Sequence, residues 1–488
     1  MKKFILYGFI FSTSFLMVLV LLTGCTKKED DGKIPITTIS EEARQDFLKG
    51  RDASENQKSL ESLQHLENAL TKDSNFALAY YYHTFANPTT KGFFEDIDKA
   101  VALADKVSEG EKLMILAFQA GTNGEQKKQE EYITKLVQLY PKDERAHSLL
   151  GQFYFGQQDY DKAIEHLSMA TEIAPNYSSS YNMLGYSNKS LGNFAEAENA
   201  FKKYIELIPG DPNPYDSYAE LLMKEGKYEE SIEQYRKALA IDPNFVSSFL
   251  GISYNYNFLG KHEDARKELQ TLYDKARNDG ERNQALFAMT VSYTDEGNFN
   301  KAMEAMQKQY VVDEKINDAG AMNGDLNAIG NILFEAGKYD EAMKKYEQAV
   351  EVILASNLSN ELKENTKKFH LYNTARVWLM KKNLKGAKEK ANEFSEKASM
   401  ANNTFQIWLS HELQGLIALQ EKDFKKAESE FKMANQQNPY TYYRLGLAYQ
   451  GMKNKEMADK HFKMAANFNA VTNLNQSFVR VKTGKMPG

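Results

Sequence analysis

The chain has 488 residues, of which 42% are hydrophobic and 26% are charged, and its formal net charge is −6. This is an ordinary composition for a folded protein, and the acidic balance argues against nucleic acid as a partner, because phosphate binding needs clustered basic charge. Cys25 is the single cysteine, which excludes an intramolecular disulfide and leaves packing as the source of stability. The length predicts either about three domains or one long array of repeats.

The N-terminus has the pattern of an export signal. Two lysines precede an apolar stretch from Phe4 to Leu22, and two small residues stand directly before Cys25. This segment resembles the lipobox of bacterial lipoproteins, which implies a signal peptide over residues 1–24 and lipid attachment at Cys25. The alternative is an uncleaved membrane span, for which the stretch is long enough. The hydroxyl side chains at positions 12–14 and the placement of the cysteine favour the lipoprotein.

Residues 25–40 are expected to form the lipidated end and a flexible tether. The segment carries many charges, contains Gly32 and Pro35, and has no helical periodicity. Ser40, followed by two glutamates, predicts a helix that starts at residue 41, because a hydroxyl cap accepts hydrogen bonds from free amides and carboxylates favour the positive helix end. We expect the folded body to begin there.

A fixed period follows in the middle of the chain. Segments beginning at Glu144, Ser178, Pro212 and Val246 align without a gap, each 34 residues after the last. One position of each segment holds a small residue: Ala163, Ala197, Ser231 and Ala265. The position four residues later holds a large one: Leu167, Phe201, Tyr235 and Leu269. A period of this kind indicates stacked copies of one supersecondary unit.

The two columns predict a pair of antiparallel helices in each unit. A small residue lets two helix axes approach, and a bulky residue one turn later lies on the same face. The turn between the helices is marked by triplets such as Gly192-Asn193-Phe194, because glycine readily adopts the left-handed conformation that ends a helix. Proline, which cannot continue a helix, closes the units at Pro175, Pro209 and Pro243.

This pattern resembles the tetratricopeptide repeat, whose consensus is matched best by Tyr181–Pro209 and Tyr215–Pro243. The resemblance implies an all-α fold, a right-handed α-solenoid (superhelix) of helix-turn-helix repeats. The expected divisions are degenerate repeats over 41–143, regular repeats over 144–279, repeats with insertions over 280–470, and a short C-terminal tail over 471–488. That tail is expected to be either a terminal cap or a loose end.

The resemblance also implies a binding surface, because family members bind partners through inward positions of the first helix in each repeat. On this chain those positions hold Gln152, Phe155, Asn182, Tyr186, Lys189, Asp216, Glu220, Leu250, Tyr254, Asn257 and Phe258. Aromatic side chains mixed with amides suit a protein or peptide partner. The alternative is that single members of this set only pack between helices or lie on the surface. Acidic side chains at two of the positions, Asp216 and Glu220, oppose the carboxylate grip of some co-chaperones in the family.

No motif of enzyme chemistry stands out. The eight histidines are scattered without an H-E-x-x-H spacing, and the chain has neither a glycine-rich phosphate loop nor a G-x-S-x-G elbow. We therefore expect no catalytic residue, no metal site and no cofactor. The chain is predicted not to be an enzyme.

The leading hypothesis is a membrane-anchored scaffold or adaptor that binds proteins at the cell envelope. Two alternatives stay open: a ligand-capture lipoprotein of the nutrient-uptake kind, and an accessory subunit of an envelope enzyme complex. Thr26, in place of aspartate after Cys25, and the charged run at 28–31 resemble features that direct lipoproteins to the outer membrane, on its periplasmic face or at the cell surface. The sequence leaves the partner and the oligomeric state open.

Overall fold

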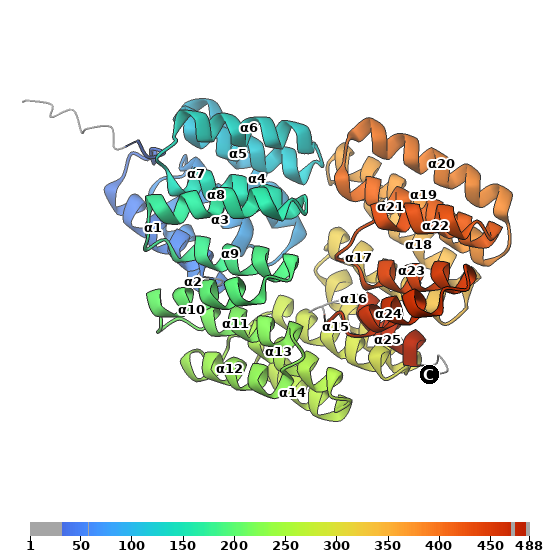
Figure 1. Ribbon diagram of the computed structural model, residues 1–488. Helices are drawn as coiled ribbons and strands as arrows, with labels where there is room; N and C mark the ends of the chain where they lie inside the picture. The colour runs from blue at the N-terminus through green and yellow to red at the C-terminus, as the bar shows by residue number, and fades with distance from the viewer. Residues whose placement is uncertain (1–31, 57, 470–473, 485–488) are drawn as a thin grey trace, which may run out of the picture.

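The computed structural model of the protein describes residues 32–56, 58–469 and 474–484, and over these ranges the chain is helical, with no strand. Each helix packs on the next in chain order, and the stack curves into a superhelix (Figure 1). The all-α solenoid that the sequence predicts is therefore confirmed. The signal peptide and Cys25 lie outside the described residues. None of the described helices combines the length and the apolar character needed to cross a membrane.

The helices fall into three groups along the chain. The first group is α1 (Glu41–Glu55), α2 (Ser59–Lys72), α3 (Ala77–Ala86), α4 (Thr90–Leu103), the short 3-10 helix η1 (Ala104–Lys106), α5 (Glu109–Thr122) and α6 (Gln126–Leu139). The second is α7 (Glu144–Gly156), α8 (Tyr160–Ile173), α9 (Ser178–Leu191), α10 (Phe194–Leu207), α11 (Asn213–Lys224), α12 (Tyr228–Ile241), α13 (Val246–Phe258) and α14 (His262–Lys275). The third is α15 (Asp279–Asp295), α16 (Phe299–Lys315), α17 (Ala319–Glu335), α18 (Tyr339–Ala355), α19 (Asn360–Met380), α20 (Leu384–Ala401), α21 (Thr404–Glu421), α22 (Phe424–Met433), α23 (Pro439–Gly451), α24 (Lys455–Ala466) and α25 (Leu474–Gly484).

The periodic columns form the contact within each helix pair. Ala197 and Phe201 of α10 are fully buried, and the Phe201 ring lies directly over Gly185 of α9, where an added Cβ would come within 2.5 Å of it. Gly192 ends α9 in the left-handed conformation, with φ at +84°. A small residue facing a large one is thus what sets the close approach of the two helices.

The insertions expected after residue 280 lengthen helices. α19 has 21 residues and both α20 and α21 have 18, whereas α11 in the regular region has 12. The expected degenerate repeats before residue 144 appear as three successive helix pairs, α1 with α2, α3 with α4 and α5 with α6.

The flexible tether predicted for residues 25–40 is wrong for its described part, because this segment is held against the repeats. The Ile34 amide donates to Asp143 Oδ2 at 2.8 Å, the Thr37 amide donates to Glu111 Oε1 at 2.7 Å, and Thr38 Oγ1 donates to Asp73 Oδ2 at 2.6 Å. These three carboxylates are almost wholly buried, so an extended backbone satisfies them. The predicted helix start is confirmed, since Ser40 caps α1.

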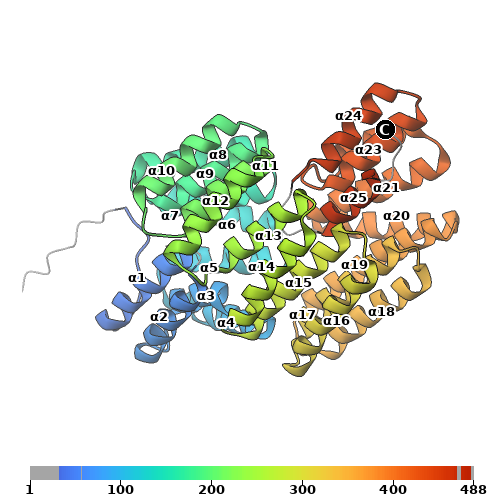
Figure 2. The same ribbon diagram turned by 90° about the horizontal axis from the view of Figure 1, so that it is seen from below.

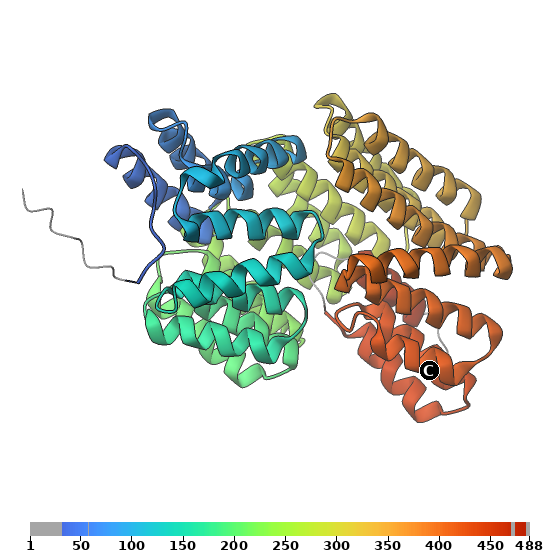
Figure 3. The same ribbon diagram turned by 90° about the horizontal axis from the view of Figure 1, so that it is seen from above.

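The two halves of the superhelix touch. Thr404 at the start of α21 donates its amide to Gln126 Oε1 at 2.6 Å, and Gln158 Nε2 donates to Asn435 Oδ1 at 2.6 Å. The N-terminal half and the C-terminal half accordingly lie side by side, with α13 to α16 between them (Figures 2 and 3). The tail predicted over 471–488 contains α25, which packs on α23, α24 and the distant α15.

Candidate functional site

The inward residues predicted from the regular repeats lie on α7, α9, α11 and α13, in different environments. Gln152 and Asn182 line a cavity of about 340 Å³, where the Asn182 amide oxygen is buried without a hydrogen-bond partner. A cavity of about 590 Å³ is lined by five of them: Phe155, Tyr186, Lys189, Glu220 and Leu250. Phe258 is half-buried. The other three are buried between helices: Asp216, Tyr254 and Asn257.

Two of the charged side chains that line the 590 Å³ cavity, Lys189 and Glu220, form an ion pair. Lys189 donates to Glu220 at 2.9 Å, and its ammonium lies 4.3 Å from the centroid of the Tyr186 ring. Asp216 accepts a hydrogen bond from Ser248 Oγ at 2.7 Å, while burial, and then the nearby Glu220, raise its pKa to about 8. Lys189 and Glu220 thus neutralise each other.

The C-terminal segment of the chain covers this same cavity. Lys224 donates to the Phe468 carbonyl at 2.6 Å, and its ammonium lies 3.7 Å from the centroid of that ring. Tyr228 donates its hydroxyl to Asn469 Oδ1 at 3.1 Å, and both Phe468 and Asn469 line the cavity. Burial lowers the pKa of Lys224 to about 8. The predicted surface is therefore shared with residues from the far end of the sequence.

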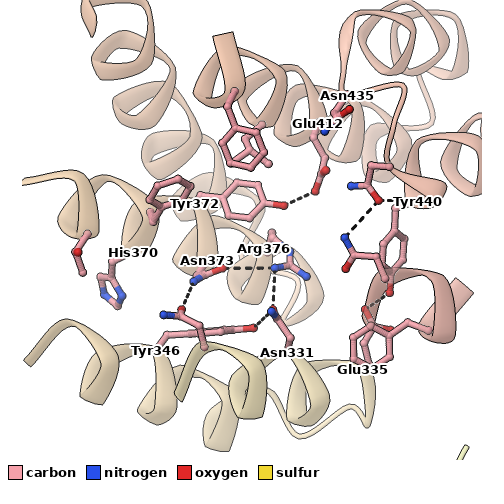
Figure 4. Close-up of a pocket in the computed structure, with 18 of the residues that line it drawn as sticks. Asn331, Glu335, Tyr346, His370, Tyr372, Asn373, Arg376, Glu412, Asn435 and Tyr440 are labelled. Atoms are coloured by element: carbon pink, nitrogen blue, oxygen red, sulfur yellow. Dashed lines mark hydrogen bonds between the residues drawn. The ribbon is translucent and has the colours of Figure 1, made fainter. Parts of the chain in front are cut away.

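A second inner surface, which the sequence analysis missed, lies in the C-terminal repeats. It is a cavity of about 550 Å³ that is rich in amide and aromatic side chains, and we call it the amide groove (Figure 4). Its lining residues come from α17, α18, α19, α21, α23 and α25, with three from the turn before α23: Asn323, Asn327, Asn331, Glu335, Tyr346, Val350, Thr366, Phe369, His370, Tyr372, Asn373, Arg376, Phe405, Leu409, Glu412, Asn435, Gln437, Asn438, Tyr440, Arg444, Asn475 and Phe478.

Arg376 is held in the amide groove by neutral groups. Its Nη1 donates to Asn331 Oδ1 at 3.3 Å and to Asn373 Oδ1 at 3.4 Å, as Figure 4 shows. The guanidinium lies 4.6 Å from the centroid of the Phe334 ring and 5.3 Å from that of Tyr372. Among the described residues no carboxylate comes within ion-pair distance of it. Arg376 therefore keeps its positive charge without a carboxylate partner.

The two carboxylates of the amide groove, in contrast, are paired. Glu412 lies 2.8 Å from Arg444 and accepts a hydrogen bond from the Tyr372 hydroxyl. Burial acts to raise the pKa of Glu412, but the charges of Arg444 and Arg376 outweigh it, and the net shift is downward. Glu335 lies 2.7 Å from Lys482 and accepts from the Tyr440 hydroxyl at 2.6 Å. Each acid thus has its own cation in contact, while Arg376 has no ion pair among the described residues.

A signal for this groove stands in the sequence. Asn323, Asn327, Asn331 and Glu335 follow one another every four residues, which places four polar side chains on one face of α17. The same helix buries Leu326, Ile329 and Ile332 on its other side. A polar stripe opposite a buried apolar face indicates an inner surface that can bind a polar ligand. The binding surface was predicted on the regular repeats over 144–279 because only those repeats keep the 34-residue period.

The described residues contain no group of three or more histidine, cysteine, aspartate or glutamate side chains arranged to hold a metal ion. Several histidines pair with single carboxylates instead: His411 lies 2.8 Å from Glu430, and His262 lies 2.9 Å from Asp295. The groups that line the amide groove can form hydrogen bonds, ring contacts and ionic contacts with a ligand.

The fold and its inner grooves define a repeat solenoid of the kind that binds other proteins, and family comparisons identify the repeats. Tetratricopeptide repeat models match residues 143–209, and again residues 326–354 and 439–470. A further model of the TPR repeat matches residues 219–252. The chain therefore carries tetratricopeptide repeats in both halves, and one of the matches includes most of α17.

The curated relatives are distant. The chain is 24% identical to the TPR repeat-containing protein YpiA of Bacillus subtilis (strain 168), over 42% of this chain and 50% of the relative. It is 23% identical to the protein CTR9 homolog of Arabidopsis thaliana, over 49% of this chain and 22% of the relative. It thus spans half or less of the length of these relatives. A solved structure of the MamA protein matches 33% of this chain and 88% of its own, at 21% identity and a TM-score of 0.28.

Proposed function

We propose that the protein is a scaffold that holds a segment of a partner protein in the amide groove. Tetratricopeptide repeats generally mediate protein–protein interaction, and matches to them occur in both halves of the chain. The observation that carries the proposal is the guanidinium of Arg376, which bonds only to amide oxygens and lies at the end of a stripe of asparagines.

The chemistry of the amide groove fits an extended peptide. Each asparagine side chain offers both a donor and an acceptor, so a row of them serves the N–H and C=O groups of a peptide backbone. Phe369 and Phe405, whose ring centroids lie 6.2 Å apart, give apolar contact area beside that row. A carboxylate on the partner segment would reach Arg376 and complete its coordination, since a guanidinium binds carboxylates with two parallel hydrogen bonds.

Photo-crosslinking in the native host tests the scaffold. A photoreactive phenylalanine analogue at Phe405, which is 44% exposed and lines the groove, should trap a defined protein. The matched control is the same analogue at Val311, which is 53% exposed on α16 and does not line the groove. A product specific to position 405 supports the proposal, whereas identical products at both positions, or none, would contradict it.

We further propose that the scaffold is attached to the cell envelope through lipid on Cys25. The support is the arrangement of two lysines, an apolar stretch, small residues and a cysteine at the N-terminus. Wild-type protein should incorporate labelled palmitate and sediment with membranes, because two or three acyl chains anchor a protein firmly. Cys25→Ser should lose both properties. Absence of label in the wild-type protein would show that the anchor is not present.

A further inference from the structure

The C-terminal helix α25 lies across the inner surface of the superhelix, away from the path of the repeats. It packs on α23 and α24, which precede it in the sequence, and equally on α15, which belongs to a repeat far upstream. In Figure 1 α25 lies next to α15 at the lower right of the molecule. Its side chains also reach α13 and α17. We call the surface on α13, α15 and α17 that receives this helix the tail groove.

The apolar side of α25 is fully engaged in the tail groove. Phe478 and Val479 are 2% and 0% exposed, and they share one apolar cluster with Val291 of α15 and Ile332 of α17. The Phe478 ring meets that of Phe299 edge to face, at 6.1 Å between centroids. The tail groove thus presents an apolar floor for one face of a short helix.

Two basic side chains of α25, which lie on different sides of the helix, meet buried acids. Arg480 Nε lies 2.9 Å from Asp295 Oδ1, and Lys482 Nζ lies 2.7 Å from Glu335 Oε2. The Asp295 and Glu335 side chains are 4% and 6% exposed, so each is a nearly buried anion. Arg480 also donates to the Asn257 carbonyl at 3.2 Å. The acids of the tail groove therefore match the two cations of α25 in sign and spacing.

The tail groove adjoins the amide groove. Phe478 lines the amide groove, and Glu335 belongs to both surfaces. Arg480 lies over Phe258, 5.0 Å from its ring centroid, so α25 also covers an inward residue expected to contact partners. A segment that binds along the inner surface meets α25 at this junction.

We propose that the tail groove is a docking site for a short helix that carries both apolar and basic side chains, and that α25 occupies it as a self-ligand until a partner helix of the same pattern replaces it. The pattern is a large apolar residue followed by basic residues two and four positions later, as in Phe478, Arg480 and Lys482. The proposal rests on the proposed scaffold function, because it assigns the chemistry of a partner to the same inner surface. While α25 is bound, its attachment to the chain gives it a high local concentration, which weakens competitors.

The test uses the full-length protein and a fluorescent synthetic peptide of residues 474–484. In the variant Arg480→Glu/Lys482→Glu the attached helix is weakened, and we expect the peptide to bind at least about tenfold more tightly than it binds the wild type. A peptide that carries the same two glutamates should not bind. The matched control is Lys460→Glu/Lys463→Glu, which makes the same charge change at exposed positions of α24 and should bind the peptide as weakly as wild type.

Hydrogen exchange on the same variant shows whether α25 is a detachable ligand or a part of the repeat core. We expect faster exchange in α25 alone, with protection kept in α15, α17 and α23. Equal peptide binding by the variant and the wild type, or loss of protection in those three helices together with α25, would overturn the proposal, since α25 would then be part of the repeat core. A crosslink specific to Phe405 that persists while the peptide fails to bind would reject this proposal alone and leave the scaffold in place.

Discussion

Glu412 of α21 and Arg444 of α23 form an ion pair at 2.8 Å, with side chains only 5% and 8% exposed. The two residues join successive inner helices at the wall of the amide groove. Such a pair is well placed to fix the spacing of those helices, because a buried charge is tolerated only with its partner in position. The Tyr372 hydroxyl donates to the same carboxylate and adds α19 to the network.

Removing the carboxylate of this pair should therefore be strongly destabilising. Glu412→Ala leaves Arg444 buried without its anion, and we expect the free energy of unfolding to fall by about 3–5 kcal/mol. Denaturant unfolding followed by circular dichroism measures it. The control is Glu341→Ala at an exposed pair with Lys338, where the change should be far smaller. Equal effects of the two variants would show that the buried pair is not structural.

Overfilling the contact between α9 and α10 should melt part of the solenoid first. Ala197 is fully buried, so Ala197→Phe has no space, and a loss of about 1–3 kcal/mol is expected. Stability in a repeat array is a sum of unit and interface terms, so the loss should appear as faster hydrogen exchange in α9 to α12. Ala195→Phe, at an exposed position of α10, is the control. A variant that exchanges like wild type would contradict this placement of Ala197.

The buried carboxylates of Asp313 and Asp325, 2% and 3% exposed, predict a pH dependence of stability. Burial, and then the neighbouring Asp313, raise the pKa of Asp325 to about 9. Gln309 and Asn283 donate to the pair at 2.7 and 2.6 Å. The folded state thus holds a proton that the unfolded state releases near pH 4, so the free energy of unfolding should fall as the pH rises from about 5 to about 9.

Asp325→Asn replaces the titrating carboxyl with a neutral amide, so unfolding no longer releases that proton. Thermal unfolding between about pH 5 and 9 should show a flatter profile for the variant than for the wild type, with the largest gain in stability at the alkaline end. Asp161→Asn, at an exposed position of α8, should keep the wild-type profile. Parallel profiles for wild type and Asp325→Asn would show that Asp325 is ionised in the folded protein.

The repeat fold could be predicted because its period reports a physical contact. Ala197 and Phe201 recur at fixed spacing since each repeat needs a small residue against a large one, and both are buried as expected. The residues that line the amide groove do not recur at such a fixed spacing. Its repeats have lengthened helices, so Arg376 and Asn331 fall outside the 34-residue frame although they lie 3.3 Å apart.

Contacts between distant parts of the chain could not be predicted from the sequence either. The carbonyl of Phe468 meets Lys224, and Arg480 meets Asp295, but no local pattern relates residues so far apart. The backbone of residues 34–39 reads as a linker by composition, and it is held by carboxylates such as Glu111 whose burial depends on the finished superhelix. Sequence periodicity reports neighbours within the stack, whereas these contacts depend on how far the stack curves.

The account depends most on the charge of Arg376 in the amide groove. The most direct measurement compares crosslinking from position 405 in the wild-type background with that in Arg376→Gln, with Arg376→Lys as the charge-retaining variant and hydrogen exchange to verify the fold. We expect the partner product to fall about tenfold in Arg376→Gln and to be partly kept in Arg376→Lys, because a lysine restores the charge without the planar fork. An unchanged product in Arg376→Gln, with the repeats folded, would contradict the central claim.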